Sequence, residues 1–291
     1  MVTPFDEELR LDLEGAVKLA SHLAGTGSEA VVVAGTTGES PVLSDEERIE
    51  LFTVLAERLT IPVIAGATTN DTAHSVELTR AAEAAGASAI LAVTPYYNRP
   101  SQSGIARHFS AVAEATSLPV LIYDIPIRTG RKVANDTMVR LAREHHNVVG
   151  VKDAAADVAG AARLLAEAPP GFECYSGDDN LTLPLLSIGA VGVVSVAAHW
   201  VGTEIAEMID AFFDGDVDGA ARLNAQLIEA VAFQSSEEAP NPMPAKAMMR
   251  AMGLPSGECR LPHGPAPEWL DEQAGAVLED VERWRAERRG G

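Results

Sequence analysis

Short apolar runs rich in valine and isoleucine alternate with longer amphipathic stretches along most of the chain. Runs of this length and composition are typical of strands that are buried on both faces of a parallel sheet. Their regular alternation with helical stretches favours an α/β fold. The predicted strands are Ala30–Ala34, Ile61–Ala65, Ala89–Thr94, Pro119–Tyr123, Val148–Val151, Phe172–Tyr175 and Gly192–Val196.

The stretches between these strands have helical spacing and recognisable helix starts. Ser44 and Glu47 form a capping-box pattern, and Asn70-Asp71 can cap the start of another helix. Further helices are predicted over Leu13–Leu23, Ser103–Ala115, Asp136–Arg143, Val158–Ala166 and Glu204–Phe213.

The order of elements predicts a (β/α)8 TIM barrel. The Val2–Phe5 segment supplies only the end of a first strand, so this strand is expected to be truncated. A doubly wound sheet is the alternative architecture, but the glycine-rich nucleotide-binding turn that usually follows its first strand is missing.

After about Gly215 the strand pattern stops, and only helices are predicted. Their ranges are Val217–Phe233, Pro244–Met252 and Pro267–Arg285, separated by turns that contain proline and glycine. We therefore divide the chain into a barrel domain, residues 1–214, and a C-terminal helical domain, residues 215–291.

Composition and charge exclude several classes of function. The chain has 42 acidic and 22 basic residues among 291, which gives a net charge of −20. Nucleic acids and anionic membranes favour basic partners, so neither is expected to bind. No apolar run approaches the ~20 residues of a membrane span, and the N-terminus does not resemble a secretory signal. Two cysteines provide no disulfide framework. A cytoplasmic location is therefore expected.

Side chains that can carry chemistry follow the predicted strands, and the active site of a β/α barrel lies at this end of its strands. All four tyrosines of the chain fall there, as do Lys152 and Arg128. These side chains are therefore expected to converge on one mouth. The segments are Gly35–Ser40, Thr94–Pro100, Tyr123–Gly130, Gly150–Asp153 and Tyr175–Asp179.

Lys152 is the most informative of the four lysines in the chain. It follows Val148-Val-Gly-Val151, on a strand that is predicted to be buried. Burial favours the neutral form of an amine, and a neutral amine can attack a carbonyl carbon to form an imine. The alternative is a structural lysine that pairs with Asp153 or another acid. If the protein uses a Schiff base, Lys152 carries it.

The Gly35–Gly38 turn and Arg128 can hold carboxylates. Gly35-Thr-Thr-Gly38 matches no nucleotide-binding fingerprint, so it is either a tight turn alone or a turn whose N–H groups and hydroxyls bind a small carboxylate. Arg128 suits bidentate recognition of a carboxylate, with a plain surface charge as the alternative. The histidines show no metal-ligand spacing, so no metal is expected.

These motifs together resemble those of the pyruvate-dependent class I aldolase family of dihydrodipicolinate synthase and N-acetylneuraminate lyase. The resemblance covers nearly the whole chain, from Val2-Thr-Pro-Phe5 through Asn241-Pro-Met-Pro-Ala-Lys246 to Leu261-Pro-His263. Gly35–Ser40, Pro95–Pro100 and Ile125–Gly130 are similar to the synthase branch. The resemblance implies condensation of pyruvate with L-aspartate 4-semialdehyde to 4-hydroxy-tetrahydrodipicolinate through a Schiff base, in lysine and diaminopimelate biosynthesis. It implies no cofactor and a homotetramer.

The resemblance also implies roles for single residues. Lys152 would form the imine with pyruvate, and Tyr123, Thr36 and Tyr97 would relay protons, with Tyr97 reaching in from a neighbouring subunit. Thr37 would bind the carboxylate of pyruvate, and Arg128 would hold the carboxylate of the semialdehyde. The mouth around the substrates would be shaped by Gly177, Val194 and Asn241.

Two other functions stay open at this point. One is an aldolase or lyase for a 2-keto-3-deoxy sugar acid, although a sugar calls for hydroxyl partners more than for a carboxylate clamp such as Arg128. The other is a catalytically impaired homologue, because an incomplete first strand would leave sheet edges unpaired. A start codon further upstream would remove that objection.

Feedback inhibition by L-lysine is expected to be weak or absent. In sensitive family members the lysine site uses a glutamate and histidines, and here Asp45, Arg48 and His74 stand at the matching places, while Asn70 and Tyr96 fit. Arg48 and His74 disfavour a cationic ligand.

Overall fold

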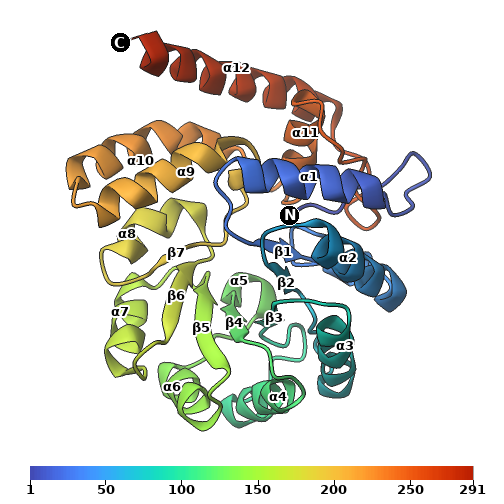
Figure 1. Ribbon diagram of the computed structural model, residues 1–291, viewed down its shortest axis with the longest axis vertical. Coiled ribbons are helices and arrows are strands. Elements are labelled where there is room, and N and C mark those ends of the chain that lie inside the picture. Colours follow the sequence, from blue (N-terminus) through green and yellow to red (C-terminus); the bar gives the residue numbers. More distant parts are fainter. Residues whose placement is uncertain (291) are drawn as a thin grey trace. The chain divides into compact units, whose positions relative to one another are not determined.

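Residues 1–290 are described by a computed structural model (Figure 1). They form two compact units. The first contains Met1–Ile61 together with the residues from Val196 onward, and the second contains Pro62–Ser195.

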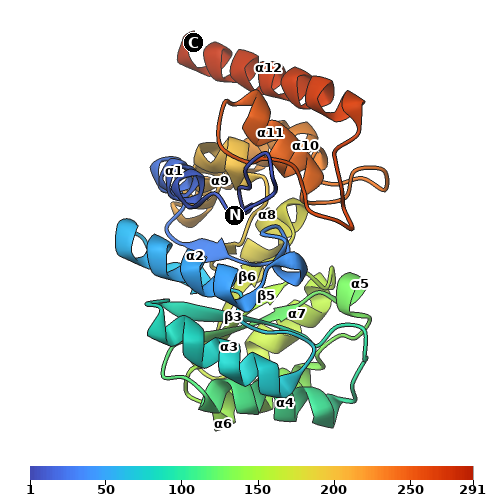
Figure 2. The same ribbon diagram turned by 90° about the vertical axis from the view of Figure 1, so that its right-hand side faces the viewer.

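The second unit is a parallel sheet surrounded by helices. Its described strands pair in the order of the sequence and are β2 (Val63–Ala65), β3 (Ala89–Val93), β4 (Val120–Asp124), β5 (Val148–Asp153), β6 (Glu173–Ser176) and β7 (Gly192–Val193). Four long helices lie outside these strands in Figure 1, namely α3 (Thr72–Ala84), α4 (Gln102–Glu114), α6 (Asn135–Glu144) and α7 (Val158–Glu167). Figure 2 shows α3 and α4 from the side. Shorter turns of helix follow three strands: α5 (Pro126–Thr129), η2 (Asp179–Leu181) and α8 (Thr182–Leu186).

The apolar runs become strands because both of their faces are covered. Ile90, Val120, Ile122 and Val151 are fully buried, as expected for a sheet under helices. Each fully buried aliphatic side chain contributes about 1.5–3 kcal/mol through its removal from water.

The first unit is mainly helical. It contains α1 (Leu13–Gly25), β1 (Val31–Val33), η1 (Ser40–Val42), α2 (Asp45–Arg58), α9 (Ala198–Phe213), α10 (Val217–Ala232), α11 (Met243–Ala251) and α12 (Glu268–Gly290). The indole Nε1 of Trp200 donates to the carbonyl of Ala230 at 3.2 Å and joins α9 to α10. Arg285 of α12 pairs with Glu204 of α9 at 2.7 Å.

Most of the predicted elements are confirmed, with differences at their ends. The helix predicted from Glu204 begins at Ala198, and Val201 interrupts it with a non-helical φ of −129°. The Val2–Phe5 segment forms no strand, since Phe5 only makes an isolated antiparallel bridge with Leu11. Val2 is nevertheless buried, and its N–H donates to Nε2 of His199 at 3.0 Å.

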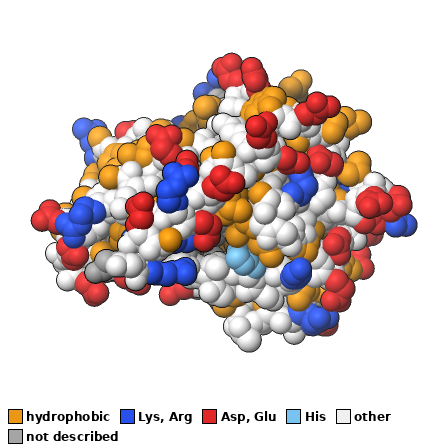
Figure 3. All heavy atoms as spheres, turned by 90° about the horizontal axis from the view of Figure 1, so that it is seen from above, with side chains coloured by type: hydrophobic (Ala, Val, Ile, Leu, Met, Phe, Trp, Pro, Cys, Tyr) orange, Lys and Arg blue, Asp and Glu red, His pale blue; other side chains and the backbone are white. Residues whose placement is uncertain are grey.

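The surface of the protein is rich in acidic side chains, as its net charge of −20 predicts (Figure 3). Acidic side chains are spread over the face shown in Figure 3, with basic side chains scattered singly or in small groups among them. Within residues 1–290, no helix is both long enough and apolar enough to cross a membrane.

Candidate active site

Tyr123 and Lys152 lie side by side near the carboxyl ends of β4 and β5. The two residues are paired in register, and Lys152 is in turn paired with Tyr175 of β6. Residues paired in this way across parallel strands share one face of the sheet. The Nζ of Lys152 lies 4.2 Å from the centroid of the Tyr123 ring, and both side chains are buried. The second unit therefore provides a buried amine next to a phenol.

The alternative hypothesis, in which Lys152 is a structural lysine paired with an acid, finds no support within its unit. None of the described residues of its unit forms a salt bridge with Lys152, although the unit contains a Lys132–Asp157 pair at 2.9 Å. The neighbouring carboxylate of Asp153 instead accepts a hydrogen bond from the N–H of Ala155 at 2.8 Å.

Asp124 and Asp153 follow Tyr123 and Lys152 by one position and are paired in register with each other. Successive residues of a strand point to opposite faces, so these two carboxyl groups lie on the face away from Lys152. Burial raises the pKa of Asp124 to about 7 and also raises the pKa of Asp153. Asp124 Oδ1 accepts a hydrogen bond from the N–H of Val133 at 3.1 Å.

Thr94 fixes the backbone of Tyr123. It is fully buried after β3, and both its N–H and its hydroxyl donate to the carbonyl of Tyr123, at 3.0 and 3.1 Å. No function of its own is predicted for Thr94 from the sequence. The sequence contained one indication of this contact: Thr94 ends an otherwise apolar run, and a buried hydroxyl there needs a hydrogen-bond partner.

Three further predicted residues lie at the same strand ends. Arg128 stands on α5, directly after β4, and its side chain is exposed. Gly177 follows β6, where a Cβ atom would lie 2.9 Å from that of Ala154, so a larger side chain would force the strands apart. Val194 continues the pairing of β7 by donating its N–H to the carbonyl of Ser176 at 2.8 Å.

Tyr97 points away from its own unit. Its side chain is 90% exposed, and its backbone has a φ of +72°, which is uncommon for a residue other than glycine. The loop itself is fixed, because Asn98 donates to the carbonyl of Asn70 at 2.9 Å and Arg99 donates to that of Gly130 at 3.0 Å. Tyr97 is therefore presented to its surroundings by an anchored loop.

Thr36, Thr37 and Asn241 belong to the first unit. The Gly35–Ser40 turn closes through three backbone bonds, in which Gly38 and Ser40 donate to Gly35 and Glu39 donates to Thr36. The hydroxyl of Thr37 accepts a hydrogen bond from Nδ2 of Asn241 at 3.0 Å. The fold thus brings together two predicted residues that lie far apart in the sequence.

An ion pair that sequence reasoning missed lies beside this turn. Lys246 Nζ is 2.6 Å from Glu39 Oε1, and the two side chains are 1% and 0% exposed. The sequence contained one indication of this pair, namely a single lysine within the apolar segment Met243-Pro-Ala-Lys-Ala-Met-Met249. A charge that is buried without a partner costs free energy, so this lysine needs an acidic partner.

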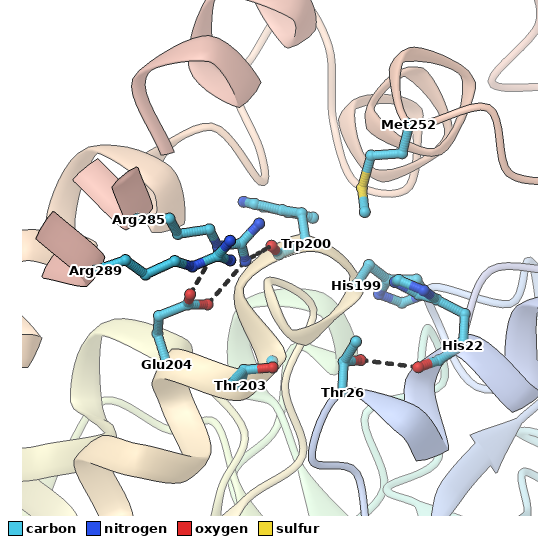
Figure 4. Close-up of a pocket in the computed structure, with 10 residues that line it drawn as sticks. His22, Thr26, His199, Trp200, Thr203, Glu204, Met252, Arg285 and Arg289 are labelled. Atoms are coloured by element: carbon cyan, nitrogen blue, oxygen red, sulfur yellow. Dashed lines mark hydrogen bonds and ion pairs between the residues drawn. The ribbon is translucent and has the colours of Figure 1, made fainter. Parts of the chain in front are cut away.

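A separate pocket of about 200 Å³ lies in the first unit (Figure 4). Its lining includes His22, Thr26, His199, Trp200 and the Glu204–Arg285 pair, and none of the nine predicted site residues. His199 is a packing residue here, since burial lowers its pKa to about 3 and its two ring nitrogens contact Val2 and Val196. Among residues 1–290 no group of three or more His, Cys, Asp or Glu side chains could hold a metal ion.

Comparison with known proteins agrees with this arrangement. The model of the dihydrodipicolinate synthetase family matches residues 1–281. The 4-hydroxy-tetrahydrodipicolinate synthase of Moorella thermoacetica is 46% identical over 283 residues, which cover 97% of this chain and 96% of the relative. This chain therefore belongs to the dihydrodipicolinate synthetase family.

Solved structures of the family have the same fold. A dihydrodipicolinate synthase from Bacillus anthracis matches with a TM-score of 0.92 and 41% identity, over 96% of this chain and 95% of the other. The enzyme from Cyanidioschyzon merolae, solved with lysine bound, matches with a TM-score of 0.93 and 40% identity, over 97% and 96%. The fold class is thus the TIM barrel followed by C-terminal helices, as the sequence predicts.

Proposed function

We propose that this protein condenses pyruvate with L-aspartate 4-semialdehyde to give 4-hydroxy-tetrahydrodipicolinate, a lyase-class reaction of lysine and diaminopimelate biosynthesis. Relatives that carry the corresponding enzyme name are about as long as this chain and 46% and 44% identical to it. The observation that carries the proposal is the buried amine of Lys152, unpaired within its unit and next to the Tyr123 ring.

The proposed chemistry begins with attack of the Lys152 amine on the ketone carbon of pyruvate. Loss of water gives an imine, which draws electrons from the methyl carbon so that a proton leaves and an enamine forms. The enamine carbon attacks the aldehyde carbon of the semialdehyde, and the new alkoxide takes up a proton. The amine of the second substrate then displaces Lys152 and closes the ring, which returns the free lysine.

Tyr123, Thr36 and Tyr97 are proposed to relay the protons of these steps. Each of the three carries a hydroxyl that can both donate and accept a proton. Tyr123 is the best supported, because its ring lies against the lysine and Thr94 fixes its backbone. A relay without a metal or an organic cofactor is sufficient for the proposed reaction.

Thr37 and Arg128 are proposed to hold the carboxylates of the two substrates. Because the Thr37 oxygen already accepts from Asn241, its hydroxyl hydrogen is free to donate to a carboxylate. The guanidinium of Arg128 is exposed and suited to bidentate binding of the semialdehyde carboxylate. Gly177, Val194 and Asn241 are proposed to shape the mouth.

The protein is further proposed to act as a cytoplasmic homotetramer. The support is the side chain of Tyr97, which is 90% exposed, and that of Ile127, which is 91% exposed. Large apolar and aromatic groups displayed in this way are typical of association surfaces. In the assembly, Tyr97 would act in a neighbouring subunit.

The test is consumption of pyruvate by purified protein, offered either L-aspartate 4-semialdehyde or N-acetylmannosamine. We expect consumption with the semialdehyde alone and its loss in Lys152→Ala. Arg128→Ala should raise the KM for the semialdehyde by roughly 10- to 100-fold, because a charge-assisted contact is lost. Arg128→Lys should raise this KM less, because the lysine keeps the charge. Consumption with the sugar alone would favour a sugar-acid aldolase, and consumption with neither would refute the proposal.

A further inference from the structure

The Glu39–Lys246 pair is fully enclosed, and each charge has more than one partner. Besides Glu39, the ammonium of Lys246 contacts the carbonyl of Glu258 at 2.9 Å and the ring of Phe5, whose centroid is 4.2 Å away. The other carboxylate oxygen of Glu39 accepts from the N–H of Arg260 at 2.9 Å. Both side chains are thereby held in one orientation.

Glu39 transfers this constraint to the turn that contains Thr36 and Thr37. Its own backbone is left-handed, with a φ of +55°, and its N–H donates to the carbonyl of Thr36 at 3.1 Å. Such a conformation costs a residue other than glycine free energy and persists where its surroundings enforce it. The side-chain contacts of Glu39 supply that enforcement.

The segment Asn241–Lys246 contacts the turn at two points. Asn241 donates to the hydroxyl of Thr37, and Lys246, on the first turns of α11, pairs with Glu39. The N–H of Lys246 also donates to the carbonyl of Pro242 at 3.0 Å, so the two contacts arise from one continuous piece of backbone.

A buried ion pair is a weak source of net stability, because desolvation of two charges offsets most of their attraction. Apolar side chains of similar size would serve a purely structural role as well or better. Beyond packing, the pair fixes the positions of both side chains, because a carboxylate and an ammonium hold each other in place.

We propose that Lys246 and Glu39 are positioning residues that hold the Thr36–Thr37 turn in the geometry that binds the carboxylate of pyruvate. This inference rests on the proposed function, in which Thr37 contacts that carboxylate. It makes the C-terminal helical segment part of the machinery for substrate recognition, although neither residue touches substrate.

The experiment measures imine formation by borohydride trapping over a range of ligand concentrations, with pyruvate and with methyl pyruvate, its uncharged ester. In Glu39→Gln and Lys246→Met we expect the half-saturating pyruvate concentration to rise about tenfold or more, as for loss of one charge-assisted hydrogen bond. The half-saturating concentration of methyl pyruvate and the trapped fraction at saturation should stay as in the unsubstituted protein.

A matched control removes a carboxylate from another ion pair of the same unit. Glu204 is 5% exposed and pairs with Arg285 at 2.7 Å, with no contact to the turn. Glu204→Gln is expected to lower stability while leaving both half-saturating concentrations unchanged. If a single variant does not fold, the double variant Glu39→Gln, Lys246→Met leaves no unpaired buried charge, and it should show the same selective loss.

Unchanged pyruvate binding in the folded variants would overturn the inference, as would an equal shift for pyruvate and for its ester. Both outcomes leave trapping by the unsubstituted protein intact, and so leave the proposed function standing. Failure of the unsubstituted protein to be trapped by pyruvate would instead overturn the proposed function and the inference together.

Discussion

At the scale of single residues, the alternation of side chains between the two faces of the sheet separates neighbouring positions at the ends of β4 and β5. Lys152 and Tyr123 share one face of the sheet, whereas Asp124 and Asp153 share the other. The amine can therefore stay close to a phenol without pairing with the acids next to it in the sequence. The acids are buried without a cationic partner of comparable burial, which is why their pKa values are raised.

Asp124 makes stability depend on pH in a predictable direction. Burial raises its pKa from 3.8 to about 7, so between about pH 4 and pH 7 the folded protein keeps a proton that the unfolded chain releases. The free energy of unfolding therefore falls as the pH rises through this range. Asp124→Asn should be more stable than the unsubstituted protein by roughly 1–3 kcal/mol at pH 8, because no charge is then buried.

The check is urea denaturation of both proteins at pH 8 and at pH 5. The advantage of the variant should shrink at the lower pH, and it should be absent in Asp136→Asn, which alters an exposed carboxyl on α6. An advantage that does not change with pH would contradict this account of Asp124.

At the scale of elements, local signals define most of the helices and strands. The apolar runs and the caps at Ser44 and Asp71 are properties of a few adjacent residues, so the sequence predicts them well. The helices α5 and α8 were missed because four and five residues show no periodicity. The division at residues 214 and 215 stays a prediction.

The capping box of α2 is a predicted motif that the structure confirms. Ser44 Oγ accepts from the N–H of Glu47 at 3.2 Å, and the N–H of Ser44 donates to the Glu47 carboxylate at 3.0 Å. We expect Ser44→Ala to lower the free energy of unfolding by about 1 kcal/mol. Ser21→Ala, an exposed change inside α1, should alter it by no more than a few tenths of a kcal/mol. Equal effects in urea denaturation would show that the cap contributes nothing.

At the scale of the whole molecule, the parts of the site that sequence reasoning missed depend on contacts between distant segments. Glu39 lies in the Gly35–Ser40 motif and Lys246 in the Asn241–Lys246 motif, yet no local pattern in the sequence pairs them. Their partnership follows only from the folded path of the chain, which also brings Asn241 to Thr37. The positions of the strand-end residues of the second unit could be predicted, because one rule places them at the same end of its sheet.

The proposed action of Tyr97 in a second copy predicts complementation between inactive variants. Lys152→Ala and Tyr97→Phe should each have little activity alone. A mixed dimer combines an intact Lys152 from one copy with an intact Tyr97 from the other. After subunit exchange in an equal mixture, about a quarter of normal activity should return if sites pair across a two-fold interface. No recovery in a mixture shown to contain mixed oligomers would place Tyr97 in its own subunit's site or outside the relay.

The response to L-lysine is a second property that can be tested on the whole protein. Arg48 is buried, and its guanidinium donates to the carbonyl of Ser40 at 2.7 Å, so this cation is a fixed feature of its surroundings. We expect this cation to disfavour a cationic ligand at the lysine site that the family resemblance implies, because like charges repel each other. We expect activity to be unchanged by micromolar L-lysine in the pyruvate-consumption assay. Inhibition in that range would show that the substituted residues still form the site.

The central claim is that Lys152 forms an imine with pyruvate, and the small number of lysines makes a direct measurement possible. The protein is incubated with pyruvate, reduced with borohydride, digested and analysed by mass spectrometry. We expect one adduct, on the peptide containing Lys152, that persists in Lys132→Ala and is absent in Lys152→Ala. An adduct on Lys18, Lys132 or Lys246 instead, or none at saturating pyruvate, would contradict the claim.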